Sequence, residues 1–134
     1  RTDADIAALQ ARLVDFRDAE TGRGRQLADA ALHLTICAAA HNQTLTDILI
    51  DLERRISVVG PGHLWGAREG HAAMEAKALA DHTELVRLIA AGDAERGGEL
   101  ARVHAHIDLD LLESARRRAI AQAEAEQAQA NSTP

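Results

Sequence analysis

The chain has 134 residues, which is enough for one domain with a single core and too short for two ordinary domains. Hydrophobic residues make up 46 % of it, mainly Ala, Leu, Ile and Val, and Phe16 and Trp65 are its only aromatic residues. Since Ala and Leu favour helices and strand-forming aromatic residues are sparse, this composition predicts an all-α fold. The net charge of −6 repels phosphate backbones, so the chain by itself is not expected to bind DNA or RNA.

The cysteine content and the hydropathy indicate a cytoplasmic location. Cys37 is the only cysteine, which excludes an internal disulfide and suits a reducing compartment. No segment approaches the roughly 20 consecutive apolar residues of a membrane span, and no signal peptide is recognisable, so no contact with membranes is expected. The only methionine is Met74, and the chain begins inside a helical pattern. We therefore expect it to be part of a longer protein.

Two helices are predicted in the first 40 residues. Thr2 and Asp5 have the spacing of a capping box, with Asp in place of Glu, at the start of a helix that runs to about residue 18. The apolar stripe of this helix consists of Ile6, Leu9, Leu13 and Phe16. After a break at residues 21–24, a second helix covers roughly residues 25–40. Its segment 27–40 is apolar on all sides except at Asp29, His33 and Thr35, which predicts a central, buried helix.

Three further helices are predicted in the rest of the chain. Asn42 can cap a third helix, which ends at the Gly-Pro-Gly sequence of residues 60–62 and precedes a loop around His63 and Trp65. The expected inward face of this helix consists of Leu45, Ile48, Leu52 and Ile56. A fourth helix spans about residues 71–91 and ends at Gly92. Asp93 is the predicted N-cap of a last long helix that runs to about residue 127.

These elements together predict an all-α, antiparallel helical bundle with a central buried helix and a long C-terminal helical hairpin. The expected domain comprises residues 1–128. The polar segment 129–134 is expected to be a frayed tail.

The chemistry of the chain is concentrated in four residues, of which two lie on the second helix. Asp29 and His33 are four residues apart, so their side chains project from the same face one turn apart. Their helix is otherwise apolar, and a buried carboxylate costs several kcal/mol unless it is compensated. The compensating group can be a metal ion or a basic side chain, for which Arg54 and Arg55 are the first candidates.

The other two residues are His82 and His104, each of which lies in an apolar stripe of the hairpin. They are 11 residues before and 11 residues after Asp93, in the turn between the two helices. Equal distances from the turn of an antiparallel hairpin place two residues at the same level. We therefore expect both imidazoles to face the core at one height, where they can share a ligand.

Three imidazoles and one carboxylate form a common ligand set for Zn²⁺, Ni²⁺, Co²⁺, Fe²⁺ or Mn²⁺. Octahedral coordination would leave two positions open for a bidentate small molecule, and an organic acid supplies suitable oxygen donors. Other interpretations remain open, because core histidines are often only hydrogen-bonded and an Asp–His pair one turn apart can be a simple intrahelical contact. The remaining histidines are expected to be solvated, and they are His41, His63, His71 and His106. Cys37 is expected to be a buried spacer.

Several segments resemble the FCD domain, the C-terminal effector-binding domain of GntR-family transcription regulators of the FadR type. Residues 28–33 contain Asp, three residues and His, and Asn42 opens the next helix as in that family. Residues 81–95 resemble the family's His-containing helix that ends in Gly-Asp, and the 22-residue gap from His82 to His104 matches its spacing. The resemblance covers about residues 3–118. Leu32 stands where the family usually has Phe, and the family's winged-helix segment is not in this chain.

The resemblance implies that one divalent transition metal ion, with zinc favoured over nickel, cobalt, iron or manganese, binds to Asp29, His33, His82 and His104. It also implies a homodimer, a small organic acid as effector, and DNA binding only through an N-terminal winged helix-turn-helix. Arg55 matches a position that is often basic and is a candidate for binding the effector carboxylate. Two alternatives are a mononuclear metalloenzyme and a metal-free structural or oligomerising bundle. The chain lacks the Glu-x-x-His and His-Glu-x-x-His motifs of known helical metalloenzymes, so we predict that it is not an enzyme.

Overall fold

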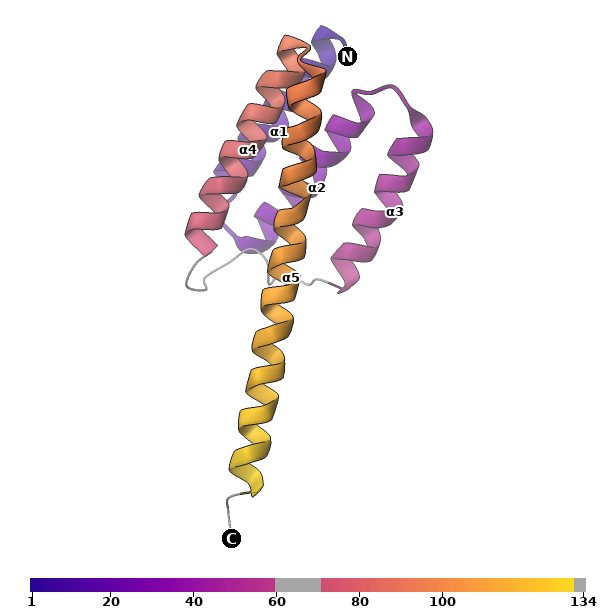
Figure 1. Cartoon of the computed structure of the whole chain (residues 1–134). Coiled ribbons are helices and arrows are strands. Elements are labelled where there is room, and N and C mark those ends of the chain that lie inside the picture. Colours follow the sequence, from indigo (N-terminus) through magenta and orange to yellow (C-terminus); the bar gives the residue numbers. More distant parts are fainter. Residues whose placement is uncertain (60–70, 132–134) are drawn as a thin grey trace. The chain divides into compact units, whose positions relative to one another are not determined.

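The computed structural model describes residues 1–59 and 71–131, and all regular elements within these ranges are α-helices (Figure 1). The helices are α1 (Asp3–Asp18), α2 (Gly22–Ala38), α3 (Gln43–Val59), α4 (His71–Ala91) and α5 (Ala94–Asn131). The all-α fold predicted from the composition is therefore confirmed. No helix in the described ranges is long and apolar enough to span a bilayer. The predicted loop around His63 and Trp65 lies outside the described residues.

The chain divides into two compact units, Arg1–His104 and Ala105–Pro134. The first unit contains α1 to α4 and the beginning of α5. The described part of the second unit is the remainder of α5, which stays helical to Asn131 and so extends four residues beyond the predicted end at residue 127. The assignment of residues 1–128 to one domain remains a prediction.

The helix starts follow the capping signals in the sequence. Thr2 and the carboxylate three residues later form the predicted capping box of α1. The side-chain oxygen of Asn42 accepts a hydrogen bond from the backbone N–H three residues on, at 3.2 Å, and Asp93 does the same at the start of α5, at 3.1 Å. Helix α2 begins at Gly22, earlier than predicted, because Thr21 acts as an N-cap in the same way. Each cap satisfies a backbone donor that the first turn of a helix leaves unpaired.

Helix α1 packs against α2 and α4, and α3 packs against α2. One apolar cluster contains the buried side chains of Leu9, Leu32, Ala39 and Val86. A second cluster is centred on Phe16, which is 1 % exposed, and on Ala78. The helix-spaced apolar stripes of α1 and α4 thus contribute to the core of the first unit, as expected.

The turn between α4 and α5 depends on Gly92, whose φ angle of 77° lies in the left-handed region. The backbone N–H groups of Gly92 and Asp93 donate hydrogen bonds to carbonyls in the last turn of α4, which ends the helix as a glycine C-cap does. Gly97 is buried, and a Cβ atom there would lie 3.7 Å from the Cβ atom of Leu88. A Cβ atom at this position would make an ordinary van der Waals contact, so the packing of the hairpin does not require glycine here.

The predicted inward face of α3 is wrong for three of its residues. Leu45, Ile48 and Leu52 are 49 %, 53 % and 47 % exposed. Ile56 lies outside the residues whose side chains are described. Apolar periodicity shows that one face of a helix is suited to burial, but it does not determine which element covers that face.

Helix α2 is central in the sense that it contacts both α1 and α3, yet it is less enclosed than its apolar sequence predicts. Leu32 is its only buried residue among those described, and Leu27 is 58 % exposed. Part of the surface of α2 therefore stays open to solvent.

Candidate metal centre

Three helices supply the four side chains that the sequence predicts as metal ligands. Asp29 and His33 lie one turn apart on α2, His82 lies on α4, and His104 lies on α5. The hairpin brings His82 and His104 to the same level, with 2.9 Å between their Nε2 atoms. The argument from equal distances to the turn is therefore confirmed.

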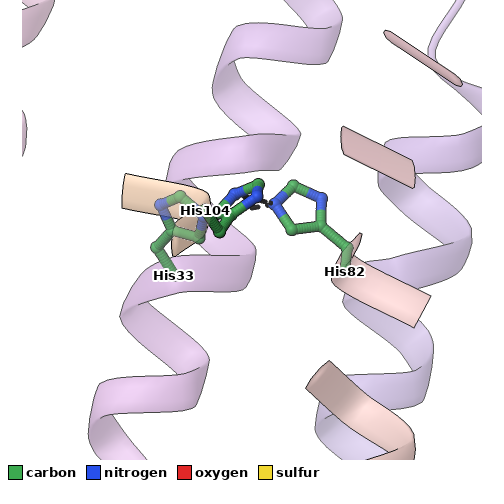
Figure 2. A group of neighbouring side chains, drawn as sticks. All are labelled: His33, His82 and His104. Atoms are coloured by element: carbon green, nitrogen blue, oxygen red, sulfur yellow. Dashed lines mark hydrogen bonds between the residues drawn. The ribbon is translucent and has the colours of Figure 1, made fainter. Parts of the chain in front are cut away.

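The other three predicted ligands all lie close to the Nε2 atom of His82. This atom lies 3.2 Å from Nε2 of His33, 2.9 Å from Nε2 of His104 and 3.4 Å from Oδ1 of Asp29. One ligand atom from each of the three histidines lies within 4.8 Å of the others. Figure 2 shows the His82 ring directing its nitrogen toward the other two rings. The structure thus brings together residues that are up to 75 positions apart in the chain (29 to 104).

The His82 imidazole at the centre of the cluster is fully buried and uncharged. The His82 side chain is 0 % exposed, and Phe16 packs against its ring edge-on, with 4.7 Å between the ring centroids. Burial, together with the neighbouring His33 and His104, lowers the pKa of His82 to about 3. His82 is therefore neutral at physiological pH. It supplies no positive charge to offset the carboxylate of Asp29, which faces its Nε2 atom.

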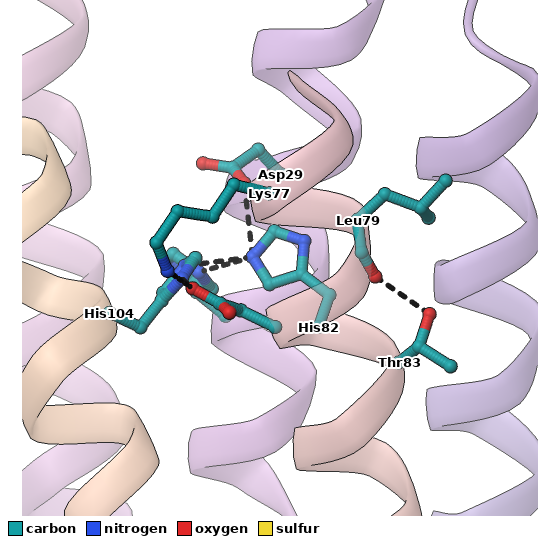
Figure 3. A network of polar contacts seen from close by, with 8 residues as sticks. Asp29, Lys77, Leu79, His82, Thr83 and His104 are labelled. Carbon is teal, nitrogen blue, oxygen red and sulfur yellow. Dashed lines mark hydrogen bonds and ion pairs between the residues drawn. The ribbon is translucent and has the colours of Figure 1, made fainter. Parts of the chain in front are cut away.

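Two further carboxylates lie behind the outer imidazoles, at their Nδ1 atoms. Oδ2 of Asp81 lies 3.2 Å from Nδ1 of His104, and the same oxygen accepts a hydrogen bond from Nζ of Lys77 at 2.7 Å. Oε1 of Glu53, on α3, lies 3.8 Å from Nδ1 of His33. Figure 3 shows Asp29, Lys77 and His104 gathered on one side of the His82 ring. This pattern leaves the Nε2 atoms of the outer imidazoles facing the centre.

Asp81 is partly buried, and burial alone would raise its pKa. The hydrogen bonds from Lys77 and His104, with the charges of both residues, outweigh that effect and lower the pKa of Asp81 below its ordinary value. Asp81 and Glu53 are absent from the predicted site. Asp81 could have been found by applying the hairpin argument one residue further, since it precedes His82. No signal in the sequence marked Glu53, because its position depends on how α3 packs against α2.

The remaining candidate residues lie apart from this convergence. The side chain of Arg55 is 73 % exposed and pairs with Asp51 at 2.8 Å, so the structure does not bring it to the four ligands. The side chain of His41 is 58 % exposed, as expected, and its Nε2 lies 2.9 Å from a carboxylate oxygen of Asp5. His106 is exposed, and Cys37 is partly buried.

Comparison with protein families gives one match, in which the family model of the FCD domain covers residues 1–107. The chain belongs to the FCD domain family. The resemblance noted in the sequence is thereby confirmed, and FCD domains are typically the ligand-sensing domains of GntR-type regulators. No curated protein and no solved structure matches the chain. The part that matches the FCD family contains all four converging residues and both carboxylates behind them.

Proposed function

We propose that this FCD domain is the metal-dependent sensing and dimerisation domain of a GntR-type transcription regulator, and that it recognises a small organic acid. The observation that carries the proposal is the convergence of three imidazole nitrogens and a carboxylate oxygen on one buried point. The proposed ligands are Asp29, His33, His82 and His104.

The spacing of the four donor atoms fits a single ion. Donor atoms bound at about 2.0–2.1 Å to one ion lie about 2.9 Å apart at a right angle and about 3.3 Å apart at the tetrahedral angle. The distances from Nε2 of His82 to the other three donors are 2.9, 3.2 and 3.4 Å. A cation also supplies the positive charge that the buried, neutral His82 lacks. The donor set suits zinc best among the common metals, and nickel, cobalt, iron and manganese are alternatives.

The charge of the site favours an anionic guest. The four ligands carry one negative charge among them, on Asp29. A bound divalent ion carries more positive charge than Asp29 neutralises, and it supplies a Lewis-acidic position for hard oxygen donors such as carboxylates. The protein groups hold the site from three helices, so occupation of the site favours one arrangement of α2 relative to α4 and the start of α5.

A sensor requires that its effector bind one of two such arrangements more tightly than the other. In the intact regulator we propose that this change alters the spacing of winged-helix DNA-binding segments in a homodimer. The acidic chain described here is not itself proposed to contact DNA.

The proposal is tested by titrating the zinc-loaded domain with a panel of small mono- and dicarboxylates, using calorimetry. We expect at least one acid to bind in the presence of zinc and to lose its binding after chelation, whereas its neutral amide analogue does not bind. Binding of the acid with equal affinity to the metal-free domain would contradict the proposal, as would the absence of binding by every acid in the panel.

A variant of Arg55 tests effector binding separately from metal binding. If Arg55 binds the effector carboxylate, Arg55→Gln should weaken binding of the acid by roughly tenfold or more, because hydrogen bonds to charged groups contribute about 1.5–3 kcal/mol. The affinity for zinc should stay unchanged. Equal affinity for the acid in both proteins would show that its present pairing with Asp51 is its only role.

A further inference from the structure

The hydrogen bond between Asp81 and His104 determines which nitrogen of the neutral His104 ring carries the hydrogen. A carboxylate only accepts hydrogen bonds, so at the 3.2 Å contact Nδ1 of His104 carries the hydrogen. In the neutral form, which is the form that binds a metal, the imidazole has only this N–H, so Nε2 of His104 then presents a lone pair. That atom is the one that lies 2.9 Å from Nε2 of His82, at the centre of the cluster.

Asp81 is itself held in place. It precedes His82 on α4, its side chain is 13 % exposed, and Lys77, one turn earlier on the same helix, donates to the oxygen that faces His104. The same stretch of α4 thus provides one imidazole of the cluster and orients a second one that comes from α5. A rotation of the His104 ring away from the centre would break the contact with Asp81.

The Nδ1 atoms of the other two imidazoles have different surroundings. Nδ1 of His82 is buried and has no hydrogen-bond partner among the described residues. Nδ1 of His33 faces Glu53 at 3.8 Å, which is beyond hydrogen-bonding distance. The contact of Asp81 with Nδ1 of His104 is within hydrogen-bonding distance, so Asp81 is placed to control the orientation of that ring.

We propose that Asp81 is a positioning residue for metal binding, which holds His104 in the Nδ1–H tautomer with Nε2 directed into the site. This inference rests on the proposed function, because it assigns a role to Asp81 in the same site. Carboxylates that orient metal-bound histidines in this way commonly contribute 10–100-fold to metal affinity.

The test compares Asp81→Ala, Asp81→Asn and the control Glu84→Gln in two measurements. Nitrogen-15 NMR of the imidazoles in the metal-free protein reports the tautomer of His104, and competition with a chromophoric chelator gives the dissociation constant for Zn²⁺. Glu84 also lies on α4 but pairs with Arg87. Alanine has the highest helix propensity, and circular dichroism and thermal unfolding establish that each variant folds.

We expect Asp81→Ala to shift His104 toward the Nε2–H tautomer and to weaken zinc binding by about 10–100-fold. Asp81→Asn retains an oxygen that can accept from Nδ1, so it should preserve the tautomer and lose less affinity, while Glu84→Gln should match the wild type. Zinc binding and a tautomer like those of the wild type in Asp81→Ala would overturn the inference. Absence of zinc binding by the wild type would instead overturn the proposed function, which keeps the two failures distinguishable.

Discussion

Saturation with Zn²⁺ is expected to raise the thermal unfolding temperature of the domain by on the order of 10 °C, and EDTA should reverse the change. A ligand that binds only the folded state contributes about 2.7 kcal/mol at a hundredfold excess over its dissociation constant. For a domain of this size, 1 kcal/mol shifts the unfolding temperature by several degrees. The proposed ligands come from α2, α4 and α5, so an ion bound to them would join segments that separate on unfolding. Differential scanning calorimetry with and without the metal measures the shift.

Two histidine variants on the same helix separate the site from nonspecific binding. His104→Ala removes one converging imidazole and should abolish most of the zinc-dependent shift. His106→Ala removes an exposed imidazole two residues later and should retain the shift. An equal stabilisation of both variants by zinc would show that the ion binds elsewhere on the protein.

Replacement of Phe16 by alanine is expected to have the largest effect on stability. Phe16 is 1 % exposed and is the largest fully buried side chain in the described part of the chain. Truncation of a buried phenylalanine typically costs about 3–5 kcal/mol, which is a large fraction of the roughly 5–15 kcal/mol that stabilises an ordinary domain. The ring also supports His82, with 4.7 Å between their centroids, so the variant should bind zinc more weakly as well. Urea denaturation of the metal-free protein measures the loss.

Val14 provides the matched control for this truncation, because it lies on the same helix and is 45 % exposed. Val14→Ala should change the free energy of unfolding by less than about 0.5 kcal/mol, as is usual for surface positions. A loss of less than about 1 kcal/mol in Phe16→Ala would mean that the core of the first unit is not centred on this ring.

Local signals in the sequence predicted the helix starts and the proximity of His82 and His104. The caps at Thr2, Asn42 and Asp93 are set by hydrogen bonds within a few residues, so the residue types alone were sufficient. It was also predictable that His82 and His104 lie at the same level along the hairpin, since a tight turn fixes the register of two antiparallel helices. In both cases the structure depends on short stretches of chain.

Features that depend on packing between distant segments were not predictable in the same way. The exposure of Leu45 and Ile48 on α3 depends on which element covers that helix, and periodicity does not specify the covering element. The proximity of Glu53 to His33 likewise depends on how α3 lies against α2. The carboxylate behind His33 therefore became apparent only in the structure.

The central claim, that this FCD domain holds one metal ion in a three-histidine, one-aspartate site, is tested most directly by the metal content of the purified protein. Elemental analysis after gel filtration in chelator-free buffer should find about one transition metal ion per chain, a stoichiometry that follows from four ligands around one point. Asp29→Ala and His104→Ala should each lose the metal. Absence of metal from the wild type, even after incubation with Zn²⁺, Ni²⁺ or Mn²⁺, would contradict the claim and leave a metal-free helical domain.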